Sequence, residues 1–209
     1  MINMGNQYAD DPEMQQKIRD KEMESLRYLV SIVNDVLDMN KLQSGEIKKQ
    51  ELTFDLIAVL RDLNQTYHKK AAEKDIRYQV ARDKDTIRHP FVIGNPVHLS
   101  RILSNITDNA IKFSHNGSVI YIQTAPRYEK VFVSVKDTGC GIPKASITKI
   151  WERFYKLDAS RGKDRKGTGL GLSIVKEIIT AHNQNINVIS TEGVGTEFIF
   201  TLAKGEAPK

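Results

Sequence analysis

The sequence predicts a two-layer α/β sandwich, with a mixed and mostly antiparallel sheet and helices on one face, preceded by a long amphipathic helix. Three observations support this fold class. Apolar residues repeat at helical spacing over a long N-terminal segment. Helical stripes alternate with short strand-like segments from residue 51 onward, and two pairs of these segments are joined by short turns.

The long helix is expected over residues 12–44. Pro12 suits the first turn, Asp10 and Asp11 are candidate caps, and Gly45 is a candidate stop. The apolar positions form one broad seam: Met23, Leu26, Leu29, Val30, Ile32, Val33, Val36 and Leu37. Such a face needs a partner, either the rest of the chain or a second copy. We favour the second copy, which makes the helix part of a homodimeric bundle.

The compact domain is expected over residues 51–204. It follows a polar segment at 1–11 and a helical unit at 12–50, and a frayed tail at 205–209 ends the chain. Helices are expected at 56–71, 96–113 and 170–182, with Asp55 and Asn95 as caps of the first two and Pro96 in the first turn of the second. Strands are expected at 51–55, 76–80, 91–93, 118–124, 130–136, 185–190 and 196–202.

The composition of the chain indicates where the protein is located in the cell and which kinds of partner it binds. The chain has 209 residues, 31 basic and 26 acidic side chains, and a formal charge of +5. This mild, scattered excess favours a solvated basic surface over a nucleic-acid interface. The lone cysteine, Cys140, fits a reducing compartment, and no apolar run is long enough to span a membrane. We therefore expect a cytoplasmic chain that contacts no membrane itself, as the cytosolic portion of a larger receptor.

One helix of the domain carries an unusual polar stripe. Within 96–113, Asn105, Asn109 and Lys112 are spaced i, i+4 and i+7, so they share a face distinct from the apolar one. Amide oxygens can serve a hard cation that keeps several of its waters, and an ammonium group can hold a phosphate. The stripe is compatible with a Mg²⁺–phosphate site and, taken alone, also with an ordinary solvated face.

Asp137, Gly139 and Gly141 directly follow a predicted strand. A carboxylate can accept a hydrogen bond from an exocyclic amine such as that of adenine, and spaced glycines let the backbone approach a ligand. A simple turn is the alternative interpretation.

A second glycine-rich segment, 167–172, opens a predicted helix. Backbone N–H groups and the helix dipole at such a position favour an anion. The spacing matches neither the P-loop nor a dinucleotide fingerprint. The preceding basic segment, 158–166, has the character of a lid over phosphates, or of a plain surface loop.

The order and spacing of the motifs are more specific than any one of them. They are Asn105–Phe113, Asp137–Gly141, Trp151–Tyr155, Gly167–Leu172 and Gly193–Thr196. Over roughly residues 51–203 the set resembles the catalytic ATP-binding domain of two-component sensor histidine kinases. The long helix resembles the second helix of that family's dimerisation and phosphotransfer hairpin.

This resemblance implies a Bergerat-type fold that binds ATP and Mg²⁺ under a flexible lid, with a response regulator or receiver domain as partner. It implies that Asp137 recognises the adenine amino group and that Thr196 supports Asp137. Asn105 and Asn109 would hold Mg²⁺, and Lys112 a phosphate. The other implied nucleotide contacts are Phe113, Gly139, Gly141, Ile142, Tyr155, Lys156, Arg161, Gly167, Thr168, Gly169, Leu170, Gly171 and Leu172.

The resemblance also bears on the reaction. Related gyrase and mismatch-repair ATPases carry a glutamate general base where this chain has Asn105. An amide cannot take a proton from water at neutral pH. The substitution favours phosphoryl transfer to another group, driven by positioning and charge neutralisation, over efficient hydrolysis.

The phosphoacceptor of that family, a histidine followed by an acidic residue, has no match in this sequence. The five histidines are His68, His89, His98, His115 and His182, and none precedes an acidic residue. We expect a fragment of a larger kinase that transfers a phosphoryl group to a histidine outside this chain and does not autophosphorylate. The alternatives are a non-catalytic nucleotide-binding dimerisation module, a hydrolytic ATPase and an anti-sigma serine kinase.

Overall fold

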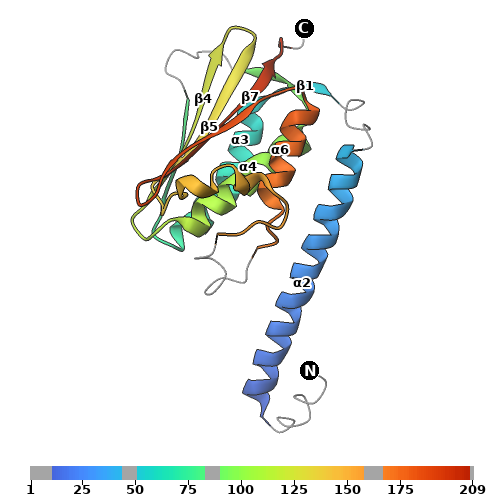
Figure 1. Ribbon diagram of the computed structural model, residues 1–209, viewed down its shortest axis with the longest axis vertical. Helices are drawn as coiled ribbons and strands as arrows, with labels where there is room; N and C mark the ends of the chain where they lie inside the picture. The colour runs from blue at the N-terminus through green and yellow to red at the C-terminus, as the bar shows by residue number, and fades with distance from the viewer. Residues whose placement is uncertain (1–10, 44–50, 83–89, 158–166, 208–209) are drawn as a thin grey trace.

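The structure, a computed structural model, describes residues 11–43, 51–82, 90–157 and 167–207 (Figure 1). Its sheet has seven strands in the order β1-β3-β7-β5-β4-β2, and β6 also pairs with β7. The strands are β1 (Leu52–Asp55), β2 (Arg77–Arg82), β3 (Phe91–Gly94), β4 (Val119–Arg127), β5 (Lys130–Asp137), β6 (Ile186–Thr191) and β7 (Gly195–Lys204). The pairing of β2 with β4 is parallel and all the other described pairings are antiparallel. The sheet is therefore mixed and mostly antiparallel, as the sequence predicts.

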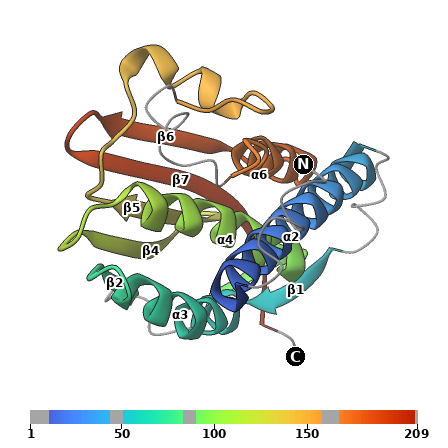
Figure 2. The ribbon, with the colours of Figure 1, turned by 90° about the horizontal axis from the view of Figure 1, so that it is seen from below.

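The helices of the domain lie on one face of this sheet (Figure 2). They are α3 (Leu56–Ala72), α4 (Pro96–Phe113) and α6 (Gly171–Ala181), and the short 3-10 turns η2 (Lys144–Ser146) and η3 (Lys149–Trp151) lead from β5 toward α6. The core is the layer between helices and sheet, where Leu103 and Ile174 meet Ile122, Val133 and Phe200, all fully buried. The prediction of a two-layer sandwich is therefore confirmed.

The predicted helix caps are present. Asp55 accepts a hydrogen bond from the Ile57 N–H at the start of α3, and Asn95 accepts from the Val97 N–H at the start of α4. Asp11 accepts from two backbone N–H groups at the start of α2 (Pro12–Gln43). Asp10 and Gly45 lie outside the described residues. Each cap satisfies a donor that the first helical turn leaves unpaired, which fixes where the helix begins.

Some element boundaries differ from the sequence prediction. The strand predicted to end at Thr124 continues as β4 to Arg127, through Pro126. Residues 125–127 pair with β5 and lie past Thr124, the last residue of β4 with a described partner in β2, so Pro126 interrupts none of the described β2–β4 pairs. The last predicted helix begins at Gly171, with Leu170 as its N-cap.

The helix α2 contacts α6, and its N-terminal end projects away from the sheet domain (Figure 1). Seven of its large apolar side chains are 40–57% exposed: Met23, Leu26, Leu29, Val30, Val33, Val36 and Leu37. Contact with α6 therefore leaves most of the predicted apolar seam uncovered. Among the described residues, no helix has the length and apolar character needed to cross a membrane.

Candidate nucleotide-binding site

The polar stripe of α4 faces the glycine-rich segment that begins α6. A Cβ atom placed on Gly171 would lie 3.0 Å from the Asn105 Oδ1 atom. A Cβ atom placed on Gly167 would lie 3.2 Å from the Lys112 Nζ atom. Asn109 lies between these two positions on the same face of the helix. The fold thus brings the Asn105 amide against the first residue of α6, and the Lys112 ammonium group against the glycine-rich segment that precedes this helix.

Asp137, at the end of β5, is a buried carboxylate with only 7% of its surface exposed. Its Oδ1 atom accepts hydrogen bonds from the Gly139 N–H at 2.9 Å and the Thr196 N–H at 3.2 Å. Its Oδ2 atom accepts none from any residue that the structure describes. Burial raises the pKa of Asp137 above its ordinary value, and the two N–H donors oppose that shift. Among the described residues, one carboxylate oxygen is therefore open to a further donor.

The loop after β5 is joined to the C-terminal end of α4. The Cys140 N–H donates to the Phe113 carbonyl oxygen at 3.0 Å, and a Cβ atom on Gly139 would lie 2.5 Å from that same oxygen. The Lys112 Nζ atom lies 5.3 Å from the centre of the Phe113 ring. Asp137 and the polar stripe of α4 are consequently parts of one continuous surface.

The turn between β6 and β7 supports this loop from the other side. Gly141 has a φ of +68°, and a Cβ atom there would lie 2.1 Å from the Thr191 carbonyl oxygen. Gly195 has a φ of +143°, and its Cβ atom would lie 2.1 Å from the Asp137 carbonyl oxygen. Both positions require glycine, because the left-handed conformation and the close backbone approach each exclude a side chain.

Ser190, which belongs to none of the sequence motifs, connects these parts. Its Oγ accepts from the Ile142 N–H at 2.8 Å, donates to the Gly195 carbonyl oxygen and lies 2.9 Å from the Thr196 Oγ1. Thr196 supports Asp137 through its backbone N–H, while its hydroxyl group faces Ser190. A serine at the end of a strand carries no sequence signal of its own, so only the fold reveals this role.

The segment after η3 meets the second glycine loop through its backbone. The Phe154 N–H donates to the Gly169 carbonyl oxygen at 2.9 Å, and both residues have positive φ, +62° and +75°. The Phe154 side chain is 63% exposed. Such a left-handed conformation is costly for a residue other than glycine, and it persists where the surrounding structure fixes it. This contact joins residues on either side of the predicted lid.

The remaining predicted residues are spread around this site. Thr168 accepts from the Leu170 N–H at 3.1 Å, the fully buried Leu170 anchors the start of α6, and Leu172 is half-buried against the core. The Tyr155 hydroxyl group donates to Ser146 Oγ at 3.0 Å and so points toward η2. Lys156 is half-buried. Arg161 lies outside the described residues.

The donor set fits a hard cation bound together with phosphate. Among the described residues, no group of three or more His, Cys, Asp or Glu side chains could hold a metal ion. Asn105 and Asn109 supply neutral oxygen ligands, which suffice where phosphate oxygens complete the shell of Mg²⁺. The glycines at 167 and 171 leave the space beside Asn105 and Lys112 that a side chain would otherwise fill.

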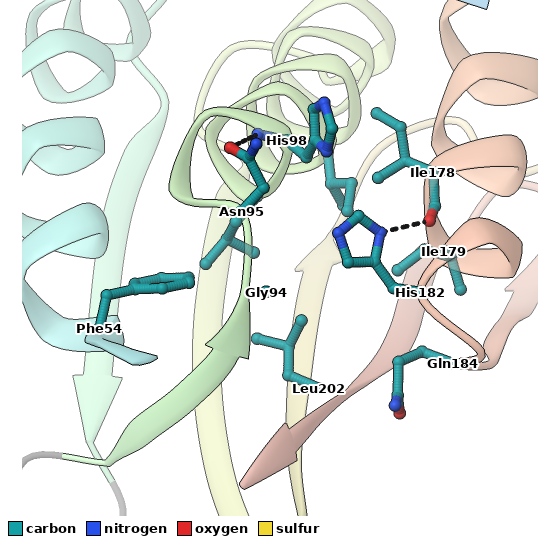
Figure 3. Close-up of a pocket in the computed structure, with 11 residues that line it drawn as sticks. Phe54, Gly94, Asn95, His98, Ile178, Ile179, His182, Gln184 and Leu202 are labelled. Carbon is teal, nitrogen blue, oxygen red and sulfur yellow. Dashed lines mark hydrogen bonds between the residues drawn. The ribbon is translucent and has the colours of Figure 1, made fainter. Parts of the chain in front are cut away.

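A separate recess lies near the other end of α4 (Figure 3). Its walls include Phe54, Asn95, Leu202 and the rings of His98 and His182, whose centres are 5.5 Å apart. The His98 Nδ1 and His182 Nε2 atoms are buried and have no partner among the described residues. The recess is mostly apolar and holds none of the predicted nucleotide contacts.

Comparison with known proteins identifies the family of the chain. The sequence profile of the histidine kinase-, DNA gyrase B- and HSP90-like ATPase family matches residues 94–206. The chain is 35% identical over 180 residues to sensor histidine kinase YclK of Bacillus subtilis, covering 86% of this chain and 37% of the relative. It is 32% identical over 196 residues to sensor protein kinase WalK of Staphylococcus aureus, covering 92% and 46%. The chain thus spans less than half the length of these relatives.

Solved structures of histidine kinases share the fold of this chain. The catalytic domain of histidine kinase ThkA, 28% identical, superposes with a TM-score of 0.64 over 74% of this chain and 96% of that domain. Full-length ShkA in complex with AMPPNP, 28% identical, gives a TM-score of 0.78 over 94% of this chain and 40% of that one. ThkA in complex with the response regulator TrrA, 25% identical, gives 0.71 over 94% and 53%.

Proposed function

Because this chain belongs to the histidine kinase-, DNA gyrase B- and HSP90-like ATPase family, and carries the ATPase domain of a sensor histidine kinase, we propose that it binds ATP with Mg²⁺ between α4 and the start of α6. In the full protein, this domain would transfer the γ-phosphoryl group to a histidine of another segment or chain. The observation that carries the proposal is the meeting of the Asn105–Lys112 stripe with the glycines at 167 and 171.

Adenine recognition is assigned to the buried end of β5. The Asp137 Oδ2 atom would accept a hydrogen bond from the exocyclic amine, and Gly139 would let the base approach the backbone. Phe113 and the half-buried Ile142 would flank the ring. The raised pKa of Asp137 supports this role, because a donor from the base would stabilise a carboxylate that burial disfavours.

Phosphate binding is assigned to the opposite end of the same surface. Lys112 would hold a phosphate as a point charge, and the backbone N–H groups at the start of α6 would face the anion. Asn105 and Asn109 would hold Mg²⁺, which when bound neutralises charge on the transferring phosphoryl group. The contribution of the chain is to orient the phosphates and to exclude water.

Phosphoryl transfer is favoured over hydrolysis because Asn105 cannot act as a general base. The acceptor is proposed to be a histidine outside this chain, since none of its five histidines is followed by an acidic residue. A response regulator is the proposed final partner, a proposal supported by the similarity to ThkA, which was solved with one.

Calorimetric titration with ADP and a non-hydrolysable ATP analogue, with and without Mg²⁺, tests this proposal. We expect binding that Mg²⁺ strengthens. No binding under either condition would overturn the assignment of the site. Adding a hairpin that contains a phosphoacceptor histidine then tests transfer. The appearance of phosphohistidine supports the kinase, whereas release of phosphate without transfer would support a hydrolytic ATPase.

A non-catalytic nucleotide-binding dimerisation module is the second candidate. It is favoured by the missing phosphoacceptor and by the exposed apolar face of α2. Nucleotide binding without phosphorylation of the supplied hairpin would favour this candidate over the kinase.

A further inference from the structure

Three residues of α4 accept hydrogen bonds from α3 and the turn after it, two through backbone carbonyl oxygens and Asp108 through its side chain. The Tyr67 hydroxyl group donates to Asp108 Oδ2 at 3.1 Å and lies 3.5 Å from the Ser104 carbonyl oxygen. Lys70 forms an ion pair with Asp108, and the Lys74 Nζ donates to the Ile111 carbonyl oxygen at 3.2 Å. We call these contacts the α3–α4 seam.

The seam runs parallel to the stripe that faces the proposed phosphates. Its positions on α4 are 104, 108 and 111, and those of the nucleotide stripe are 105, 109 and 112. Asp108, the one position that uses its side chain, is the chain neighbour of Asn109, which separates these two side chains by about 100° around the helix. Any rotation of α4 that breaks the seam therefore also turns Asn105 and Asn109 away from the start of α6.

Of the two partners of Asp108 in the α3–α4 seam, Tyr67 is buried and Lys70 is exposed. Tyr67 is only 7% exposed, and its ring stacks on that of Tyr78 with centres 6.4 Å apart. Burial and the neighbouring Asp108 raise the pKa of Tyr67 well above its ordinary value, so that its hydroxyl group stays protonated and donates. Asp108 is half-exposed, and its pair with Lys70 alone is worth little. Together, a buried donor and a cation hold one carboxylate from two directions.

We propose that Asp108, held by Tyr67 and Lys70, is a positioning group that sets the direction of the Asn105 and Asn109 amides toward Mg²⁺–phosphate. This inference rests on the proposed function. Asp108 contacts no proposed ligand atom and acts through α4. Groups that orient metal ligands commonly affect metal affinity by roughly 10- to 100-fold when they are removed.

A purely structural role predicts a different result. Loss of packing would lower the melting temperature and weaken all nucleotide binding alike. Loss of orientation at Asn105 and Asn109 would weaken only the part of binding that depends on Mg²⁺, because adenine is assigned to Asp137 at the end of β5. The ratio of nucleotide affinity with Mg²⁺ to affinity in a chelator therefore separates the two roles.

The experiment measures this ratio by calorimetry for ADP and a non-hydrolysable ATP analogue. Tyr67→Phe removes one hydroxyl group, Asp108→Asn removes the charge, and Asp108→Glu keeps it. We expect Tyr67→Phe and Asp108→Asn to lower the affinity ratio by roughly 10-fold or more without changing the affinity measured in the chelator. We expect Asp108→Glu to keep most of the wild-type ratio. Matched controls are Tyr128→Phe, at a tyrosine that is 94% exposed, and Asp62→Asn on the exposed side of α3.

The outcomes separate this inference from the proposed function. If Mg²⁺ raises the nucleotide affinity of wild type, and raises that of Tyr67→Phe and Asp108→Asn by the same factor, the positioning role is overturned and the proposed function stands. An equal loss with and without Mg²⁺ also overturns it. Wild-type protein that binds no nucleotide overturns the proposed function, and this inference fails with it.

Discussion

At the scale of single residues, Asp137 is an ionisable group held where its charge is disfavoured. The residue is 7% exposed, and among the described residues its carboxylate receives two backbone N–H donors, both on one oxygen. A core that only required stability would place a neutral side chain here. The arrangement is typical of a group whose missing partner is a ligand.

We predict that Asp137→Asn abolishes nucleotide binding while it makes the nucleotide-free domain more stable at neutral pH. Asparagine presents an N–H₂ group or a weaker acceptor where the adenine amine needs a carboxylate. Because the folded pKa is raised, ionisation of Asp137 opposes folding, and stability is lost as pH rises from the ordinary value through the folded one. Calorimetry measures the binding, and thermal unfolding at pH 7 and at acidic pH measures the stability.

The pH comparison is the control for this prediction. At a pH where Asp137 is protonated, the advantage of the variant in melting temperature should shrink, since the charge is absent from both proteins. An unchanged nucleotide affinity would contradict the adenine role. A variant that melts lower than wild type at neutral pH would contradict the argument from burial.

The sequence allowed the charged and amide residues of the site to be predicted, because few residue types can perform their chemistry. Asp137, Asn105 and Lys112 belong to this group. Ser190 and the positive φ of Phe154 could not be predicted, since their roles come from segments far apart in the chain. Thr196 was predicted to support Asp137, but the sequence did not indicate that its backbone N–H, and not its side chain, makes the contact.

At the scale of elements, the site depends on the distance between α4 and the start of α6. Gly171 is the first residue of α6, and a Cβ atom there would lie 3.0 Å from the Asn105 Oδ1 atom. Its φ is not positive, so alanine fits the backbone. The glycine is needed for the space next to the amide and not for the conformation of the chain.

We therefore predict that Gly171→Ala weakens Mg²⁺-dependent nucleotide binding without lowering the melting temperature. Replacing glycine by alanine where the backbone allows it stabilises a protein by about 0.4–1 kcal/mol, because the unfolded chain loses conformational freedom. The added methyl group displaces the Asn105 amide by a few tenths of an ångström. The comparison variant is Gly141→Ala, where the left-handed φ and the Thr191 carbonyl oxygen predict a clear loss of stability. If Gly171→Ala and wild type have the same melting temperature and the same Mg²⁺-dependent nucleotide affinity, the space beside the Asn105 amide is not needed for binding.

The pair of histidines near the opposite end of α4 predicts a dependence of stability on pH. Burial and the neighbouring His182 lower the pKa of His98. Below its ordinary pKa of about 6.5, the unfolded chain binds a proton that the folded chain resists, so stability is lost as pH falls from that value through the folded pKa. We expect thermal unfolding to show this loss in wild type and a smaller one in His98→Gln. An identical pH profile would contradict the prediction.

Element boundaries were harder to predict than element types. The spacing of apolar residues determines which segments are helices, and the capping residues at 55 and 95 determine where two of them begin. The end of β4 is set by its hairpin with β5, where Arg127 pairs with Lys130, and not by β2, whose last described pair with β4 is Arg82 with Thr124. Proline by itself argues against a strand, and the place of Pro126 beyond the described β2–β4 pairs depends on a strand more than forty residues earlier.

At the scale of the whole molecule, the sandwich domain buries its large apolar side chains, whereas α2 leaves most of its own exposed. The sandwich encloses a continuous apolar layer, but α2 keeps large apolar side chains exposed despite its contact with α6. Burying such side chains stabilises an association by roughly 1.5–3 kcal/mol each when exposure is fully removed. The seam of α2 is therefore the part of the described chain best suited to meet a second copy.

We predict that the chain self-associates through this seam and that Val33→Glu returns it to a monomer. Val33 is half exposed at the middle of the seam, where a charge would have to be buried in each copy. Light scattering measures the mass, and calorimetry should show unchanged nucleotide binding, because α2 supplies no residue of the proposed site. Lys21→Glu, at an exposed position of α2 outside the seam, is the matched control and should leave the mass unchanged. A monomeric wild type would contradict the prediction and indicate that α2 remains on its own domain.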